Sequence, residues 1–176
     1  MMKKQFPILL ISTLFVLGAA QASDTPATLA ISGTATNGST GCSVNMSPTT
    51  ISLESIPQNV MPRQGGNSIP KSPISLSISG SSECYALALA NHLAYRFVGI
   101  PDDAEGTVLA NTDTTSQAAT GVGIGLYDMH GKFLSIKDTV PVNNLDSINM
   151  QVVSLKGQRA TEGSVTGTLT IQLDRL

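Results

Sequence analysis

Few residues in this chain have the types and spacing that catalysis or ligand binding requires. The glycine-rich stretch GVGIG at 121–125 is similar to part of a dinucleotide-binding loop, but such a loop needs a further glycine where Leu126 stands and a helix after it. The following residues, LYDMHGKFL, favour a hairpin that turns between Asp128 and Gly131. We therefore interpret the glycines as one face of a strand that another backbone approaches closely.

The remaining candidates for chemistry are two histidines and one acidic group. His92 and His130 are the only histidines, and neither has the spacing of a metal ligand or of a catalytic triad, so we expect surface or packing roles. The acidic residues Asp102, Asp103 and Glu105 do not follow the spacing of a calcium loop, and a solvated loop is the simpler expectation. The sequence thus predicts no catalytic residue, no cofactor site and no metal site, and an enzyme is disfavoured.

The first 22 residues have the pattern of a secretory signal peptide. Lys3 and Lys4 precede an apolar run that ends in the small-residue motif AQA at 20–22. A membrane-spanning helix would need about 20 apolar residues and polar flanks. We therefore expect cleavage after Ala22 and no stable insertion into a membrane.

The composition of the expected mature chain excludes several classes of partner. Loss of Lys3 and Lys4 leaves 8 basic and 12 acidic residues, a net charge of about −4. A weakly acidic chain without a cluster of basic residues does not favour nucleic acid or an anionic membrane as a partner. Tryptophan is absent and only 4% of residues are aromatic, so no stacking platform for bases or sugars stands out.

Cys42 and Cys84 are the only cysteines, an even pair in a chain that we expect to be exported. Their spacing excludes a CxxC redox motif, and two thiols without neighbouring histidine ligands make a poor zinc site. We predict one disulfide, which in the chain-entropy view would stabilise the domain by about 4 kcal/mol.

Beyond the first cysteine the sequence alternates in short runs separated by Pro, Gly, Asn and Asp. This pattern is typical of an all-β sandwich or barrel. The expected strands lie at 51–56, 74–78, 85–90, 94–98, 122–128, 148–155 and 165–173. A short helix is the alternative at 85–90, which is rich in Ala and Leu. The stretches 55–73 and 101–120 are expected to be loops, the second with one short strand at Val108 and Leu109.

The leader ahead of the first cysteine also alternates, although it is rich in Gly, Ser and Thr. Apolar or small residues share one parity, and mostly hydroxyl-bearing residues share the other. The first set consists of Ala27, Leu29, Ile31, Gly33 and Ala35. The leader is therefore predicted to be a strand with one buried-type face, and the question is what covers that face.

These features resemble the subunits of bacterial chaperone–usher fimbriae of the type 1-like kind. The resemblance covers the entire chain and rests on the signal peptide, the leader ending in GCSV, the cysteine spacing and three later stretches. The stretches are FVGIPDDAEGTVLANT at 97–112, GVGIGLYDMHGKFLSI at 121–136 and EGSVTGTLTIQLDRL at 162–176.

The resemblance implies an all-β fold, an incomplete immunoglobulin-like β-sandwich completed by a strand donated from a chaperone or a neighbouring subunit. It implies a signal peptide at 1–22, a donor-strand extension at 23–41 and a pilin domain at 42–176. The leader residues Ala27, Leu29, Ile31, Gly33 and Ala35 would enter successive pockets of another molecule. One edge of this subunit's own groove would be formed by Val165, Gly167, Leu169, Ile171 and Leu173.

The implied partners are a periplasmic pilus chaperone, an outer-membrane usher and neighbouring pilin subunits, and the implied location is a fimbrium on the cell surface. The leader argues against a chain terminator, and a single domain argues against a two-domain tip adhesin. The family usually has an aromatic residue next to last, where this chain has Arg175, and this departure favours a minor or adaptor subunit over the bulk shaft protein. Two alternatives remain open. The leader could fold back onto its own domain, and the chain could be a self-contained secreted sandwich that recognises host glycans or proteins through its loops.

Overall fold

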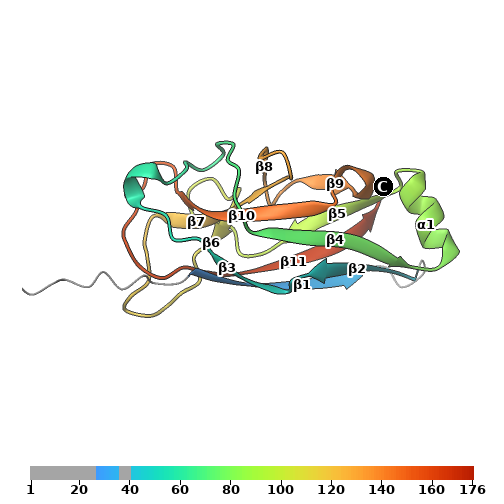
Figure 1. Cartoon of the computed structure of the whole chain (residues 1–176), viewed down its shortest axis with the longest axis horizontal. Coiled ribbons are helices and arrows are strands. Elements are labelled where there is room, and N and C mark those ends of the chain that lie inside the picture. Colours follow the sequence, from blue (N-terminus) through green and yellow to red (C-terminus); the bar gives the residue numbers. More distant parts are fainter. Residues whose placement is uncertain (1–26, 36–40) are drawn as a thin grey trace, which may run out of the picture.

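The computed structural model describes residues 27–35 and 41–176, which fold into an elongated sandwich of two β-sheets (Figure 1). The strands are β1 (Ala27–Ala35), β2 (Cys42–Ser47), β3 (Thr50–Leu53), β4 (Pro73–Gly80), β5 (Leu93–Val98), β6 (Leu109–Ala110), β7 (Val122–Tyr127), β8 (Phe133–Leu134), β9 (Thr139–Pro141), β10 (Ser147–Ser154) and β11 (Thr166–Arg175). The helical elements are η1 (Gln58–Val60), α1 (Ser82–Leu89) and η2 (Val142–Asn144). The expected signal peptide at 1–22 lies outside the described residues.

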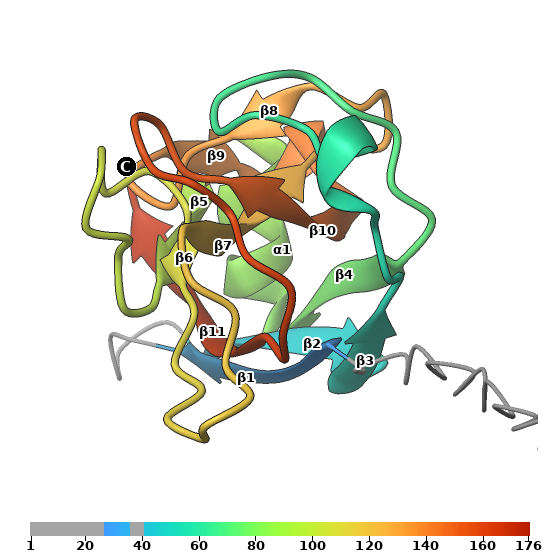
Figure 2. The ribbon, with the colours of Figure 1, turned by 90° about the vertical axis from the view of Figure 1, so that its left-hand side faces the viewer.

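The two sheets have the orders β3-β1-β11-β5-β9 and β2-β4-β10-β7-β6, and β8 pairs with β7. Figure 2 looks along the long axis and shows the sheets closing around a common interior. Within these sheets, β1 and β11 form a parallel pair, and the other strand pairs are antiparallel. The all-β fold class is confirmed.

Side-chain alternation explains which faces of the strands are buried. In β4, Ile74 and Leu76 point into the core, and Ser75 and Ser77, which alternate with them, point outward. In β11, Leu169, Ile171 and Leu173 are all at most 3% exposed. The central strand β7 departs from this pattern because both of its faces are covered.

The outer face of β7 has a small apolar cluster of its own. Tyr127 packs there with Val108, Val153 and Leu155, and its ring meets the ring of Phe133 edge to face at 6.0 Å between centroids. Burial raises the pKa of Tyr127 to about 12. Its hydroxyl has no hydrogen-bond partner among the described residues.

The strand expected at 85–90 is wrong, because α1 occupies this segment. Ser81 caps the helix by accepting a hydrogen bond from the Cys84 amide at 3.4 Å, and Glu83 lies in the first turn, where an acidic side chain is favourable. Cys84 and Ala88, which are four residues apart, are the buried residues of the helix. The short helix that was the alternative is therefore the correct assignment.

Gly123 and Gly125 of GVGIG lie in β7, where their lack of a side chain permits close packing, as expected, whereas Gly121 precedes the strand with a φ of 64°. A Cβ at Gly123 would lie only 2.7 Å from the carbonyl oxygen of Leu109 in the neighbouring strand β6. The hairpin to β8 turns as predicted, with the Gly131 amide donating to the Asp128 carbonyl at 3.1 Å. Residues 122–125 of this stretch are thus part of a structural strand.

The predicted disulfide joins Cys42, the first residue of β2, to Cys84 in α1, with 5.4 Å between the Cα atoms. Both cysteines are buried, Cys84 completely. The disulfide connects the helix to β2, which pairs with β4 at one edge of the second sheet. No helix in the described part of the chain is long and apolar enough to cross a membrane.

Candidate strand-pairing groove

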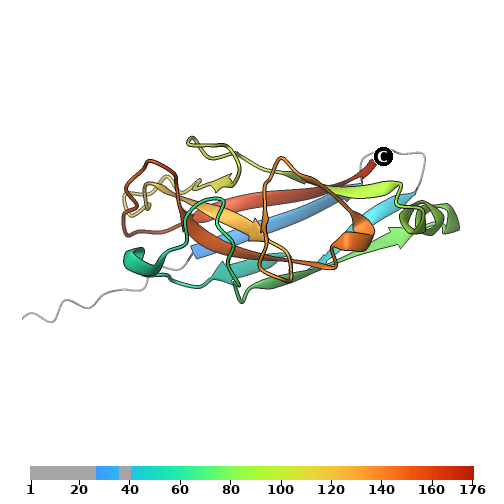
Figure 3. The ribbon, with the colours of Figure 1, turned by 90° about the horizontal axis from the view of Figure 1, so that it is seen from above.

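The predicted leader strand exists as β1, and it lies between β3 and β11 of the same chain. Its register places Leu29 beside Ile51 of β3 and beside Gly167 of β11. Figure 3 shows β1 and β11 running alongside each other along the domain. The space between β3 and β11, which we call the groove, is therefore filled in this chain by its own leader.

Two leader side chains carry the burial of β1. Leu29 is fully buried and Ile31 is 5% exposed, whereas Thr28 and Ala30 face solvent. This alternation is the one that the sequence predicts. At Gly167 an added Cβ would lie 3.2 Å from Leu29 Cδ1 and 2.8 Å from Ile124 Cδ1, so the absence of a side chain there makes room for Ile124 and Leu29.

The expected groove-edge residues lie along β11, except Val165, which directly precedes it. Val165, Leu169, Ile171 and Leu173 are each at most 3% exposed. The parallel register sets Ile31, Gly33 and Ala35 opposite Leu169, Ile171 and Leu173, respectively. For Ala27, Gly33 and Ala35 only the backbone pairing is described. Their roles as donor-strand residues in another subunit stay a prediction.

The direction of β1 follows from its connection to the domain. Residues 36–40 separate the end of β1 from Gly41, and β2 begins at Cys42. This short link keeps the end of β1 close to the start of β2, and it leaves β1 parallel to β11. The position of β1 matches the alternative in which the leader folds back onto its own domain.

Asn111 fixes the start of the groove edge, and sequence analysis did not identify it. Its amide nitrogen donates to the carbonyls of Ala119 and Ser164, at 2.9 and 3.0 Å. Its amide oxygen accepts from the Thr166 backbone at 2.9 Å. A single asparagine in a loop gives no local signal for this role, because its partners Ser164 and Thr166 lie 53 and 55 positions away.

The groove continues into an open cavity of about 610 Å³ at the end where β1 begins. Ile56, Gly163 and Val165 line this cavity, and the Thr28 amide donates to the Val165 carbonyl at 3.0 Å. The cavity therefore adjoins the first paired residues of the leader.

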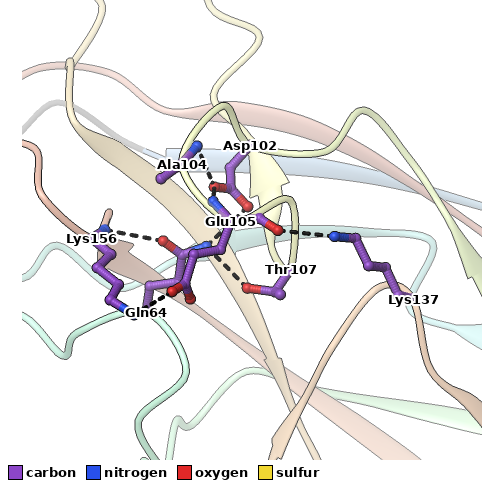
Figure 4. A network of polar contacts seen from close by, with 7 residues as sticks. All are labelled: Gln64, Asp102, Ala104, Glu105, Thr107, Lys137 and Lys156. Carbon is purple, nitrogen blue, oxygen red and sulfur yellow. Dashed lines mark hydrogen bonds and ion pairs between the residues drawn. The ribbon is translucent and has the colours of Figure 1, made fainter.

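Asp102 corrects the expectation of a solvated acidic loop, because it is only 6% exposed. Its carboxylate accepts hydrogen bonds from the amides of Ala104, Glu105 and Val108 at 2.9 to 3.1 Å. Gln64, which sequence analysis did not identify, adds a fourth from its side chain at 3.0 Å (Figure 4). Burial alone would raise the pKa of Asp102, but these hydrogen bonds together outweigh it and lower the pKa to about 2.

The other candidates for chemistry are not assembled into a site. His92 is exposed and takes part in the fold through its backbone, which accepts from the Leu176 amide at 2.9 Å. His130 is exposed in the β7–β8 turn. The described residues contain no group of three or more His, Cys, Asp or Glu that could hold a metal ion.

An ion pair across the sheet lies near the end of β11. Arg96 Nε lies 2.6 Å from the carboxylate of Asp174, and the side chains are 46% and 33% exposed. A partly exposed pair of this kind contributes little to stability. It marks the C-terminal end of the groove edge.

Comparison with known proteins agrees with this architecture. The sequence model of the family described as "Fimbrial protein" matches residues 29–174, which span the described domain from the buried leader residue Leu29 to Asp174. A comparison with curated proteins finds no matching relative. The match extends over most of the chain and includes both β1 and β11, so this chain belongs to the fimbrial protein family.

Proposed function

We propose that this fimbrial subunit polymerises by donor-strand exchange, with its leader at 27–35 completing the groove of a neighbouring subunit. As a member of a structural family, the chain is not an enzyme; it is a component of a cell-surface appendage and interacts with other pilin subunits. The proposal concerns how that interaction is made.

The observation that carries the proposal is the position of β1 between β3 and β11. Among the described strands, β3 pairs with β1 alone. Without β1, one side of β11 would lose its backbone partners, and the apolar residues beneath Leu29 and Ile31 would be uncovered. An unpaired edge next to an apolar groove accepts an added strand, because main-chain hydrogen bonds give affinity and alternate side chains give register.

The direction of β1 supplies a reason for exchange. The chain's own leader is tied to Gly41 and lies parallel to β11. The leader of a second subunit has no such tie and can enter antiparallel, and antiparallel pairing is slightly more stable per residue. Exchange would thus replace a tethered parallel strand with an antiparallel one, while the groove stays filled.

A periplasmic chaperone and an outer-membrane usher complete this proposal. A chaperone strand would occupy the groove before the leader of the next subunit does, and the usher would be the place of exchange. The groove is apolar and covered, which supports a role for a chaperone strand, because an open apolar groove in a newly exported chain would promote aggregation. The role that fits this chain is a minor, adaptor or shaft subunit.

The same position of β1 also favours a second candidate, a self-contained sandwich that needs no donated strand and acts by binding host glycans or proteins. In that case β1 would be a permanent first strand. The two candidates differ in whether β1 must leave its own groove during assembly.

A reversible cross-link tests this difference. Ala30 and Thr168 are register partners on the solvent-facing side of β1 and β11, and adjacent strands lie about 4.8 Å apart, a separation that a disulfide can bridge. In the double variant Ala30→Cys/Thr168→Cys, the oxidised chain should stay monomeric and mild reduction should restore fibre formation. The native disulfide should survive such reduction because both of its cysteines are buried.

The single variants Ala30→Cys and Thr168→Cys are the controls and should assemble whether oxidised or reduced. Fibres that form from the oxidised double variant would show that the leader does not need to move. That result would remove strand exchange by β1 and leave the self-contained sandwich.

A further inference from the structure

A second concavity lies outside the groove between β3 and β11, and it shares Gln58, Asn59 and Met61 with the cavity at the end of that groove. This cavity, of about 630 Å³, is formed by residues 58–64 and 154–160, with Glu105 also in its lining. We call it the basic pocket. Its volume lies in the range of sites that bind small ligands.

Basic residues are concentrated in the basic pocket. Lys3 and Lys4 lie outside the described residues, which leaves 8 of the 10 basic residues, and three of these line the pocket: Arg63, Lys156 and Arg159. Glu105 is the only carboxylate among the described lining residues. The lining therefore has a formal charge of about +2 in a chain whose net charge is −2.

The two arginines are available to a ligand. Lys156 is engaged, because its Nζ lies 2.5 Å from the Glu105 carboxylate. Within the described part of the chain, no carboxylate lies within ion-pair distance of Arg63 or Arg159, and both are exposed. A guanidinium without a protein partner offers paired N–H donors that suit a carboxylate.

The walls of the basic pocket are fixed by hydrogen bonds. The Gln64 side chain accepts from the Lys156 amide and donates to Asp102 and Thr107, each at 3.0 Å (Figure 4). The backbone N–H of Gln64 donates to the backbone carbonyl of Ser154 at 2.9 Å. Segments 58–64 and 154–160 are therefore held against each other before any ligand arrives, which lowers the cost of ordering on binding.

The rest of the lining identifies the kind of ligand. Gln58, Asn59 and Gln158 add amide groups, which can both donate and accept and so match sugar hydroxyls. The NH₂ groups of Gln58 and Gln158 already donate to the Ala160 carbonyl and to the Asp103 carboxylate, so each of these two side chains offers a ligand its oxygen and one further N–H. No aromatic side chain is among the described lining residues, so base stacking is not provided. Met61 and Leu155 supply the limited apolar surface that a sugar ring can contact.

We propose that the basic pocket binds a short acidic oligosaccharide, with Arg63 and Arg159 holding a sugar carboxylate and the amide side chains holding neighbouring hydroxyls. This inference goes beyond the proposed assembly function and does not depend on it. It gives the subunit a means to attach to uronic acid-containing polysaccharides along a fibre, without a separate tip protein.

The test measures binding of a glucuronic acid-containing tetrasaccharide to the purified chain by titration calorimetry or NMR, at low and at high salt. We expect saturable binding that weakens as salt rises, because exposed charges are screened. Arg63→Gln and Arg159→Gln should each weaken binding at least about tenfold, as expected for loss of a charge-assisted hydrogen-bonded pair. Lys71→Gln, which changes an exposed basic residue outside the pocket lining, should alter it by no more than about twofold.

Several outcomes would overturn the proposal. They are no saturable binding at millimolar ligand, equal binding of the carboxyl-reduced tetrasaccharide, tighter binding of a glutamate-rich peptide, or equal losses in Lys71→Gln and the arginine variants. Thermal unfolding of each variant separates a local effect from misfolding. Fibre assembly should be unchanged in Arg63→Gln and Arg159→Gln. A negative result in the binding test would therefore leave strand exchange untouched, and a negative result in the cross-link test would leave the basic pocket untouched.

Discussion

Leu29 of the leader and Gly167 of the last strand lie opposite each other, and the Leu29 and Ile124 side chains together border the space that a side chain at Gly167 would need. An added Cβ at Gly167 would lie 3.2 Å from Leu29 Cδ1. Gly167 is not in a left-handed conformation, so its backbone can accept other residues. Glycine is therefore required at this position by the packing of the groove and not by the backbone conformation.

Gly167→Val should therefore narrow the groove. The branched side chain would meet Leu29 and Ile124 together, and overpacking of this kind costs about 1–3 kcal/mol. We expect lower urea stability of the monomer and slower fibre formation. Gly157→Val is no suitable control because Gly157 has a positive φ of 74°, whereas Thr168→Val changes the solvent-facing neighbour and should assemble normally. Normal assembly of Gly167→Val would contradict a role for this position in strand pairing.

A charge on the buried face of the leader should block its insertion into any groove. Ile31→Asp would place a carboxylate where the side chain is 5% exposed, and an unpaired buried charge costs several kcal/mol. We expect no fibres from this variant. Ala30→Asp is the matched control, because it puts the same residue on the exposed face of the same strand. Equal fibre yields from the two variants, measured by sedimentation, would argue that neither face of the leader is used.

Local sequence patterns predicted most of the fold because strands report their faces through a period of two. The expected strands at 74–78, 94–98, 122–128 and 148–155 all appear, as β4, β5, β7 and β10. The segment 85–90 was assigned wrongly because its apolar residues suit either structure. The helix was selected by the Ser81 cap and by the disulfide partner Cys84 facing inward, which are features of the surrounding fold.

The groove was predicted only in part, for a physical reason. Periodicity showed that Leu29 and Ile31 needed cover, but no pattern within a strand specifies which strand provides it. The burial of Asp102 was missed for a similar reason. Its hydrogen-bond partner Gln64 lies 38 positions earlier, and three of its donors are backbone amides that every sequence possesses.

Loss of the disulfide should cost more stability than loss of most single side chains. Cys42 and Cys84 are separated by 42 positions, and closing such a loop stabilises the folded state by about 4 kcal/mol in the chain-entropy view. We expect Cys42→Ser and the double variant with Cys84→Ser to lose similar amounts in urea unfolding. Stability equal to that of the unsubstituted chain would show that the bond does not constrain the unfolded chain.

Tyr127→Phe should leave the domain as stable as before or raise its stability by up to about 1 kcal/mol. The hydroxyl is buried without a partner among the described residues, so removing it relieves a desolvation cost while the ring contact with Phe133 remains. Tyr95→Phe offers a comparison at another fully buried tyrosine. A loss above about 1 kcal/mol in Tyr127→Phe, measured by urea unfolding, would indicate that the hydroxyl has a partner.

Asp102 should make the domain sensitive to acid in a defined range. Its pKa is about 2 in the folded chain and 3.8 as a reference value, so the folded state binds its proton less readily than the unfolded state does. The stabilisation is complete above about pH 5 and is lost as the pH falls through 4 towards 2. The difference in pKa corresponds to about 2 kcal/mol.

Asp102→Asn should remove this acid-dependent contribution, because the amide cannot ionise and its NH₂ group would face donors that the carboxylate now accepts. Unfolding in urea at pH 7 and at pH 3 should give a smaller difference for Asp102→Asn than for the unsubstituted chain, together with lower stability at pH 7. Asp103→Asn changes the exposed neighbour and should keep the full difference. An unchanged pH dependence in Asp102→Asn would mean that other carboxylates, and not the one enclosed by Gln64 and the loop amides, control the acid response.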